Sequence, residues 1–118
     1  MLNANRFEGI YFYEGIIDFR KQIDGLAALV SQVLVKDPYS KCLFVFLSRD
    51  RRKIKALYWD HSGYALWTKR LERERFSIQR SRNDRTVEIN REQLEWFLSG
   101  MDWWRIKRHN PIYFEKSA

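Results

Sequence analysis

The chain has 118 residues, of which 45% are hydrophobic and 31% are charged, and it carries a formal net charge of +7 at pH 7. A chain of this size can bury a core without disulfides, and its single cysteine, Cys42, excludes a disulfide-stabilised scaffold. No apolar run approaches the roughly 18 residues that a membrane span needs, and the N-terminus has no signal-peptide pattern. We expect a cytoplasmic protein with one domain over residues 1–104 and a tail over residues 105–118 whose order the sequence leaves open.

The first predicted elements in chain order are a short strand and a long helix. Residues 9–13 are aromatic and β-branched apart from one glycine, which is typical of a strand. Asp18 can cap a helix, and apolar residues then recur at spacings of three and four. This pattern predicts an amphipathic helix from about 19 to 34, followed by a turn at Pro38.

Three strands are expected next, at residues 42–47, 53–59 and 64–69. The last two are joined by a stretch that begins with Asp60 and ends with Gly63, which favours a four-residue hairpin loop in which the glycine takes a positive φ. An antiparallel meander is the simplest consequence. Alternation over residues 75–79 allows a further edge strand.

A second helix is expected after the sheet. Asn90 and Gln93 have the spacing of a capping box, and Gly100 is a suitable C-terminal stop. The predicted fold class is therefore α+β, a mainly antiparallel meander sheet of three to five strands with one long helix packed on a face and a second helix after the sheet.

The positive charge is concentrated in the middle of the chain. Between Arg49 and Arg85 there are 12 Lys or Arg against 5 Asp or Glu, whereas the other residues carry 10 of each. Lys and Arg on phosphates release counterions and give a salt-dependent affinity, so this region predicts nucleic-acid binding. The expected contact residues lie at the first loop of the meander and at its far end: Arg49, Arg51, Arg52, Lys53, Lys55, Lys69, Arg70, Arg73 and Arg75.

Two other uses of this region stay open. Any of Tyr58, Trp59, Tyr64 and Trp67 can stack on bases where it is exposed, although most of these rings are expected in the core. Alternatively, the basic patch docks an acidic protein surface, with Trp103 and Trp104 as hydrophobic anchors.

No catalytic or metal site is expected. Zinc needs several ligands at close spacing, whereas His61, His109 and Cys42 lie far apart, and the scattered glycines form no phosphate-binding loop. A metal-dependent nuclease needs converging carboxylates, and the acidic residues of the basic region are explained by their cationic neighbours, so this is the weakest alternative. We expect no enzyme activity, no cofactor, no small-molecule ligand and no membrane contact.

Four segments together resemble a known family in order and spacing. They are residues 18–26 (DFRKQIDGL), 43–46 (LFVF), 51–60 (RRKIKALYWD) and 69–76 (KRLERERF). They are similar to the TnpB-type accessory protein, encoded by the second open reading frame of bacterial IS66 insertion sequences, over residues 8–102. The resemblance implies an accessory role in DNA transposition, with the DNA of the mobile element and the separate, larger transposase as partners. It supplies no catalytic residue, and it implies nucleoid association if the protein binds DNA.

The chain departs from the family's pattern at a few positions. His61 stands where a glycine is usual after Trp-Asp, and Ile78 and Gln79 replace a usual Trp-Pro pair. Residues 16–17 replace a more polar or proline-containing approach to Asp18, and the tail after Trp104 is extra. The change at His61 bears on the geometry of the hairpin turn more than on the role.

Overall fold

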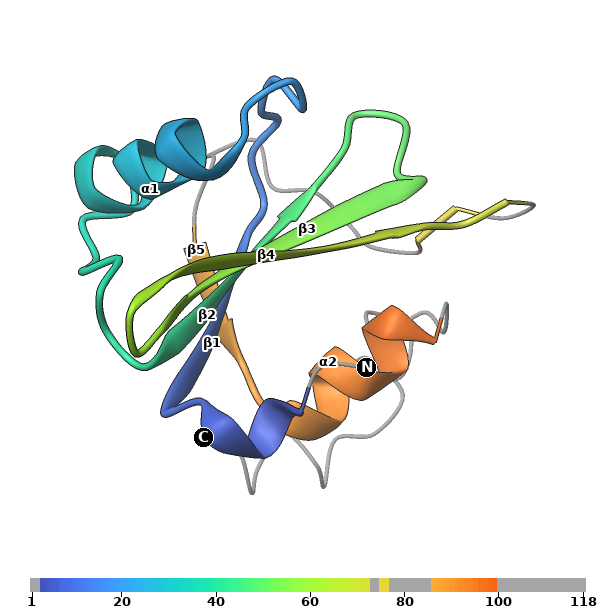
Figure 1. Ribbon diagram of the computed structural model, residues 1–118. Helices are drawn as coiled ribbons and strands as arrows, with labels where there is room; N and C mark the ends of the chain where they lie inside the picture. The colour runs from blue at the N-terminus through green and yellow to red at the C-terminus, as the bar shows by residue number, and fades with distance from the viewer. Residues whose placement is uncertain (1–2, 73–74, 77–85, 100–118) are drawn as a thin grey trace.

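The computed structural model describes residues 3–72, 75–76 and 86–99. It contains a short 3-10 helix, five strands and two α-helices among these residues (Figure 1). In chain order they are η1 (Ala4–Arg6), β1 (Gly9–Tyr13), α1 (Ile23–Gln32), β2 (Cys42–Leu47), β3 (Lys53–Asp60), β4 (Gly63–Arg70), β5 (Thr86–Ile89) and α2 (Arg91–Leu98). Neither α-helix is long and apolar enough to cross a membrane.

The strands form one sheet in the order β4-β3-β2-β1-β5. The β2-β3-β4 part is the predicted antiparallel meander, and β5 also pairs antiparallel with β1. Only β1 and β2 are parallel, from Gly9 opposite Cys42 to Tyr13 opposite Phe46. A parallel pair needs a long crossover, which α1 provides. The α+β prediction with a mainly antiparallel sheet is confirmed.

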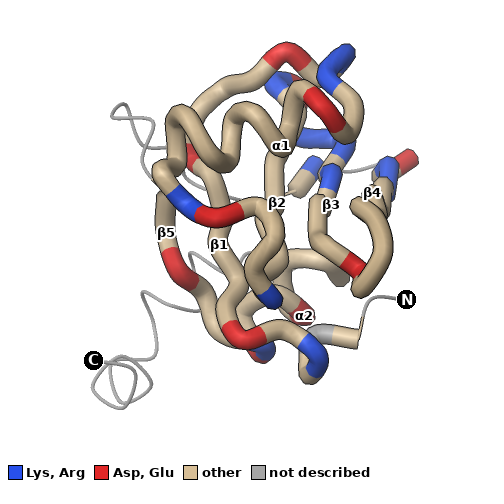
Figure 2. Tube along the Cα trace, turned by 60° about the vertical axis from the view of Figure 1, so that its left-hand side comes forward, with Lys and Arg blue, Asp and Glu red and all other residues tan. Residues whose placement is uncertain are grey.

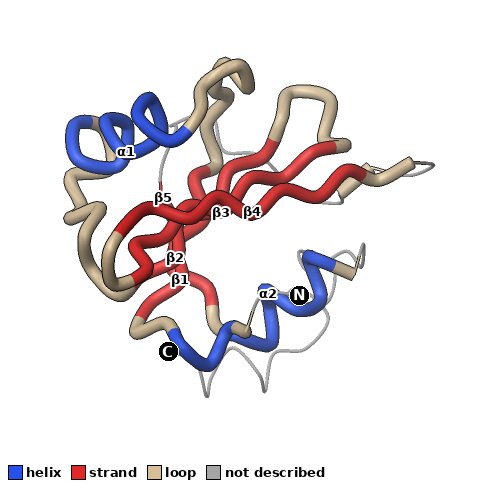
Figure 3. Tube along the Cα trace, viewed as in Figure 1, coloured by secondary structure: helices blue, strands red, loops and turns tan. Residues whose placement is uncertain are grey.

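The two helices cover opposite faces of the sheet (Figure 3). The central strand β2 is therefore buried on both sides, which explains its unbroken apolar sequence. Because side chains alternate along a strand, Phe44 and Phe46 pack with Leu26 and Val30 of α1. Val45, which lies between them, packs on the α2 side. The α2 side is the larger core cluster and includes Phe97, whose ring lies 5.5 Å from that of Phe12.

The first helix is shorter than the predicted 19–34. It begins at Ile23, and its N-cap is Gln22 rather than Asp18. The Asp18 carboxylate instead accepts a hydrogen bond from the Arg20 N–H at 3.0 Å, in a turn. The Phe19 carbonyl is bound by the side chain of Lys55, so this segment packs as a loop although its apolar residues keep helical spacing.

The β3–β4 turn also differs from the prediction. Asp60 pairs with Gly63, so the loop has two residues instead of four. The residue with positive φ is His61, at 50°, and Gly63 is an ordinary strand residue. Pairing along the whole of β3 and β4 fixes this tighter turn, which a hydrogen bond from the Ser62 N–H to the Asp60 carbonyl closes.

The C-terminal elements agree with the sequence at the helix and differ at the sheet edge. Asn90 and Gln93 form the predicted capping box, with hydrogen bonds of 2.8 and 2.9 Å. One edge of the sheet is β5; of residues 75–79, where the alternation allowed an edge strand, only Arg75 and Phe76 are described and neither is in a strand. Phe76 is fully buried in the α2-side core. Gly100 and the expected tail lie outside the described residues.

Candidate nucleic-acid interface

Basic residues from separate parts of the chain meet at one end of the sheet. Figure 2 shows the basic segments before α1, at the start of β3 and at the end of β4 close together. The segment after β4 joins them, because the Leu71 and Phe76 N–H groups bind the Arg52 and Arg51 carbonyls at 2.8 and 2.6 Å. We call this region the basic end: Arg20, Lys21, Arg49, Arg51, Arg52, Lys53, Arg70 and Arg75.

The loop between β2 and β3 presents its arginines outward because polar bonds fill its interior. The Ser48 hydroxyl donates to the Asp50 carboxylate at 2.6 Å and accepts from the Lys53 N–H at 3.0 Å. The bonds from Ser48 and from the Arg52 N–H hold the pKa of Asp50 below its usual value. Asp50 therefore shapes the loop and makes no ion pair with its arginines. Arg51 takes a φ of 61°, uncommon for a residue with a side chain.

Lys53 and Arg70 lie directly opposite each other across the β3–β4 ladder. Like charges in such positions destabilise a strand pair. Both side chains are exposed, and Lys53 has no ion pair within the described part of the chain. The facing positions of Lys53 and Arg70 are therefore not explained by an attraction between them, and the one ion pair that involves either residue among the described ones, Arg70 with Glu72, is exposed to water.

Two acidic residues partly neutralise the basic end. Arg20 pairs with Asp18 at 2.6 Å, and its hydrogen bond lowers the pKa of Asp18 to about 2. Arg70 pairs with Glu72 at 2.9 Å. These pairs are exposed to water, where such contacts contribute little and a phosphate can displace the carboxylate.

Two of the predicted contact lysines have their amines bound to backbone carbonyls. Lys55 is only 6% exposed, and its Nζ donates to the carbonyls of Phe19 and Lys21, both at 2.8 Å. Burial lowers the pKa of Lys55. The Nζ of Lys69 donates to the Leu98 carbonyl at 2.7 Å, at the C-terminal end of the α2 dipole.

The structure places Arg49, Arg51, Arg52, Lys53, Arg70 and Arg75 at one end of the sheet, whereas the sequence analysis expected two groups, at the first loop of the meander and at its far end. Lys55 and Lys69 are turned to other partners. Arg73, Trp103 and Trp104 lie outside the described residues. Sequence reasoning missed Arg20 and Lys21 because it placed them in the helix. The residue pair Lys21-Gln22, which has no capping side chain before the apolar run, is the only signal of the later helix start.

A groove of about 920 Å³ opens between the loop before α1 and the strands β3 and β4. Its lining includes four cationic side chains against two carboxylates: Arg20, Lys53, Lys55 and Arg70 against Asp18 and Glu72. An open, polar and basic groove of this kind suits a charged backbone better than an apolar small molecule.

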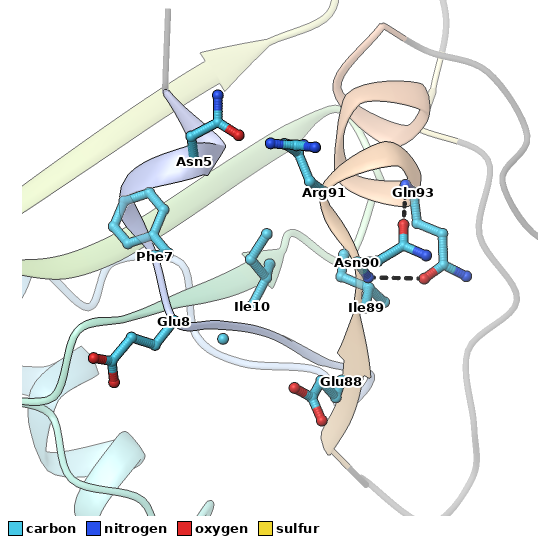
Figure 4. A pocket seen from close by; sticks show the side chains of 10 residues that line it. Asn5, Phe7, Glu8, Ile10, Glu88, Ile89, Asn90, Arg91 and Gln93 are labelled. Atoms are coloured by element: carbon cyan, nitrogen blue, oxygen red, sulfur yellow. Dashed lines mark hydrogen bonds between the residues drawn. The ribbon is translucent and has the colours of Figure 1, made fainter. Parts of the chain in front are cut away.

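A second hollow, of about 660 Å³, lies between η1 and the start of α2 (Figure 4). Its charged lining consists of Glu8 and Glu88 against Arg91, and its amides Asn90 and Gln93 are joined to the backbone in the capping box. Its charge does not favour phosphate. Across the residues that the structure describes, no three His, Cys, Asp or Glu side chains are grouped so that they could hold a metal ion.

Comparison with known proteins identifies the family of the chain. The family model described as IS66 Orf2 like protein matches residues 8–108. The chain belongs to this family. Two uncharacterized proteins of Sinorhizobium fredii (strain NBRC 101917 / NGR234) are similar: y4jC is 37% identical over 92 residues, 78% of each chain. The other, y4hO, is 35% identical over 103 residues, 87% of this chain and 89% of its own. No solved structure matches. Membership in the IS66 Orf2-like family links the chain to transposition in an accessory role.

Proposed function

We propose that this IS66 Orf2-like protein is a non-enzymatic accessory factor that contacts the DNA of its insertion sequence through the basic end. In this role it acts in the bacterial cytoplasm, at the nucleoid, beside a transposase that carries out the chemistry. The exposed cations, the open groove and the family all support a phosphate-rich partner.

The observation that carries the proposal is the Lys53 and Arg70 pair. The repulsion between the two cations is relieved when a phosphate lies between them, because Lys53 gains an opposite charge and Arg70 can exchange the exposed Glu72 carboxylate for the phosphate.

The test is a titration of duplex DNA over a salt series with two double variants of equal charge. K53Q/R70Q removes the facing pair, and K36Q/R91Q removes two exposed cations outside the basic end. Each lost phosphate contact lowers the slope of log affinity against log salt by about 0.9, so we expect the first variant to lower it by about 1.8 and the second to leave it unchanged.

Equal slopes for the two variants, or no binding of the unaltered protein at low salt, would refute contact through this surface. The alternative is an adaptor that binds the cognate transposase without touching DNA. In that case the basic end meets an acidic protein surface, and K53Q/R70Q reduces co-purification with the transposase instead.

A further inference from the structure

The other end of the β3–β4 hairpin carries a cluster of three aromatic rings. Trp59 of β3 lies across from Tyr64 of β4, with ring centroids 5.0 Å apart and an edge-to-face arrangement. Tyr39, from the loop before β2, contacts both rings at 4.9 and 5.6 Å. We call these three residues the aromatic end.

Most of this cluster is not part of the hydrophobic core. Tyr64 packs against the α1-side core cluster, but Trp59 and Tyr39 belong to neither cluster. Tyr39 is 60% exposed. Large rings that contact one another at the surface, and not the core, leave aromatic faces open to water.

A pocket of about 440 Å³ lies beside these rings. Its lining combines aromatic and cationic side chains: Arg6, Phe7, Tyr39, Lys41, Trp59 and His61. Arg6 is already held by Asp60 at 2.8 Å and lies over the Tyr58 ring. Lys41 is exposed and forms no ion pair with any described residue, so it is the cation available to a ligand.

We propose that the aromatic end binds an unpaired nucleobase of single-stranded DNA, with Lys41 beside its phosphate. Aromatic rings stack on any base, and a neighbouring cation pairs with the backbone, which is how proteins hold single strands without reading sequence. A base inside a duplex has both faces covered and cannot enter. This inference rests on the proposed function, since it requires that the protein binds DNA.

The two ends of the hairpin suit one DNA molecule with a duplex part and a single-stranded part. Lys53 and Asp60 are seven residues apart on β3, which corresponds to about 23 Å at the usual rise of a strand. About seven base pairs of duplex span the same length. The natural probe is therefore a duplex with a single-stranded overhang, compared with the same duplex with blunt ends.

The experiment compares Y39A with Y39F, because Tyr39 is exposed and Y39F keeps the ring. We expect Y39A to weaken binding of the overhang probe roughly five- to 150-fold, the range for loss of one stacked base, and Y39F to bind as the unaltered protein does. Neither variant should change the affinity for the blunt duplex or the salt slope. I16A, at an exposed apolar residue elsewhere, controls for loss of surface area.

An overhang with abasic sites separates stacking from phosphate contact. The unaltered protein should bind the abasic overhang as weakly as Y39A binds the normal overhang. Y39A should bind the two overhangs with the same affinity. Equal overhang binding by Y39A and Y39F would overturn the inference, whether or not Y39A has a lower melting temperature. Binding of the blunt duplex in the same experiment would still support the proposed function. If no probe binds at low salt, both fail.

Discussion

The two ends of the β3–β4 hairpin share one ladder of hydrogen bonds but differ in the surroundings of their charged side chains. At the basic end Lys53 faces Arg70; Lys53 has no ion pair with any described residue, and the ion pair of Arg70 with Glu72 is exposed to water. At the aromatic end the cation Arg6 is matched by Asp60 and covered by rings. Contact at the first end should weaken steeply with salt, whereas stacking at the second should not.

The comparison also separates cations that share a strand. Lys53 and Lys55 lie on the same face of β3, two residues apart. The loop before α1 covers Lys55 and stops short of Lys53. What lies above a lysine, and not its place in a basic run, decides whether it is free to meet DNA.

The largest expected effect comes from replacing each of these two lysines with methionine, which keeps the length of the side chain. K55M leaves the carbonyls of Phe19 and Lys21 without their donor, so we expect the free energy of unfolding to fall by about 1 to 3 kcal/mol. K53M should change it by no more than about 0.5 kcal/mol, as is usual for an exposed site, while lowering the salt slope by about one. Denaturant unfolding and DNA titration measure the two quantities.

A methionine at position 55 that left stability unchanged would show that relief of the buried charge offsets the lost hydrogen bonds. Hydrogen exchange of residues 18–22 provides a second measure. Faster exchange in K55M but not in K53M is expected if Lys55 holds this loop and, with it, Arg20 and Lys21 at the basic end.

A smaller effect is expected at the hairpin turn. His61 has a φ of 50°, where a side chain is strained and glycine is not. H61G should raise the free energy of unfolding by about 0.5 to 1 kcal/mol, because relief of strain exceeds the added freedom of the unfolded chain. H61A removes the same imidazole without the relief and should not stabilise; equal melting temperatures for the two variants would contradict this explanation.

The same change at the basic end sharpens the contrast. Arg51 also has a positive φ, at 61°. R51G should stabilise the protein by a similar amount but weaken duplex binding, because it removes one cation of the basic end. H61G should stabilise it and leave duplex binding unaltered.

The sequence predicted those elements whose signals are local. The strand at 42–47 is an unbroken apolar run, and the capping box of Asn90 and Gln93 needs only its own spacing. The alternation of the two hairpin strands likewise depends on neighbours in the chain. These patterns require no knowledge of what packs above them.

The errors come from contacts between distant residues. The start of α1 depends on Lys55, more than thirty residues away, which binds the Phe19 and Lys21 carbonyls. The hairpin turn was misread because glycine is the common residue at positive φ, whereas the register here puts His61 there and Gly63 in the strand. For the same reason the basic run in the sequence did not show that Lys55 is buried or that the amine of Lys69 is bound to a backbone carbonyl.

The smallest expected effect is the pH dependence of stability that Tyr64 contributes at the aromatic end. Burial, followed by a hydrogen bond with Tyr39, raises the pKa of Tyr64 from 10.0 to about 12. Between these values the unfolded chain has lost a proton that the folded protein keeps, so stability should fall as pH rises through this window. Y64F has no proton to lose at this position, so its free energy of unfolding should fall less over this window. Below about pH 9 the free energies of unfolding of the two proteins, measured by denaturant unfolding, should show the same dependence on pH. Y39F removes the hydroxyl partner and should move the absorbance titration of Tyr64 toward 10; an unchanged titration would mean that burial alone shifts this pKa and that Tyr39 is held by ring contacts only.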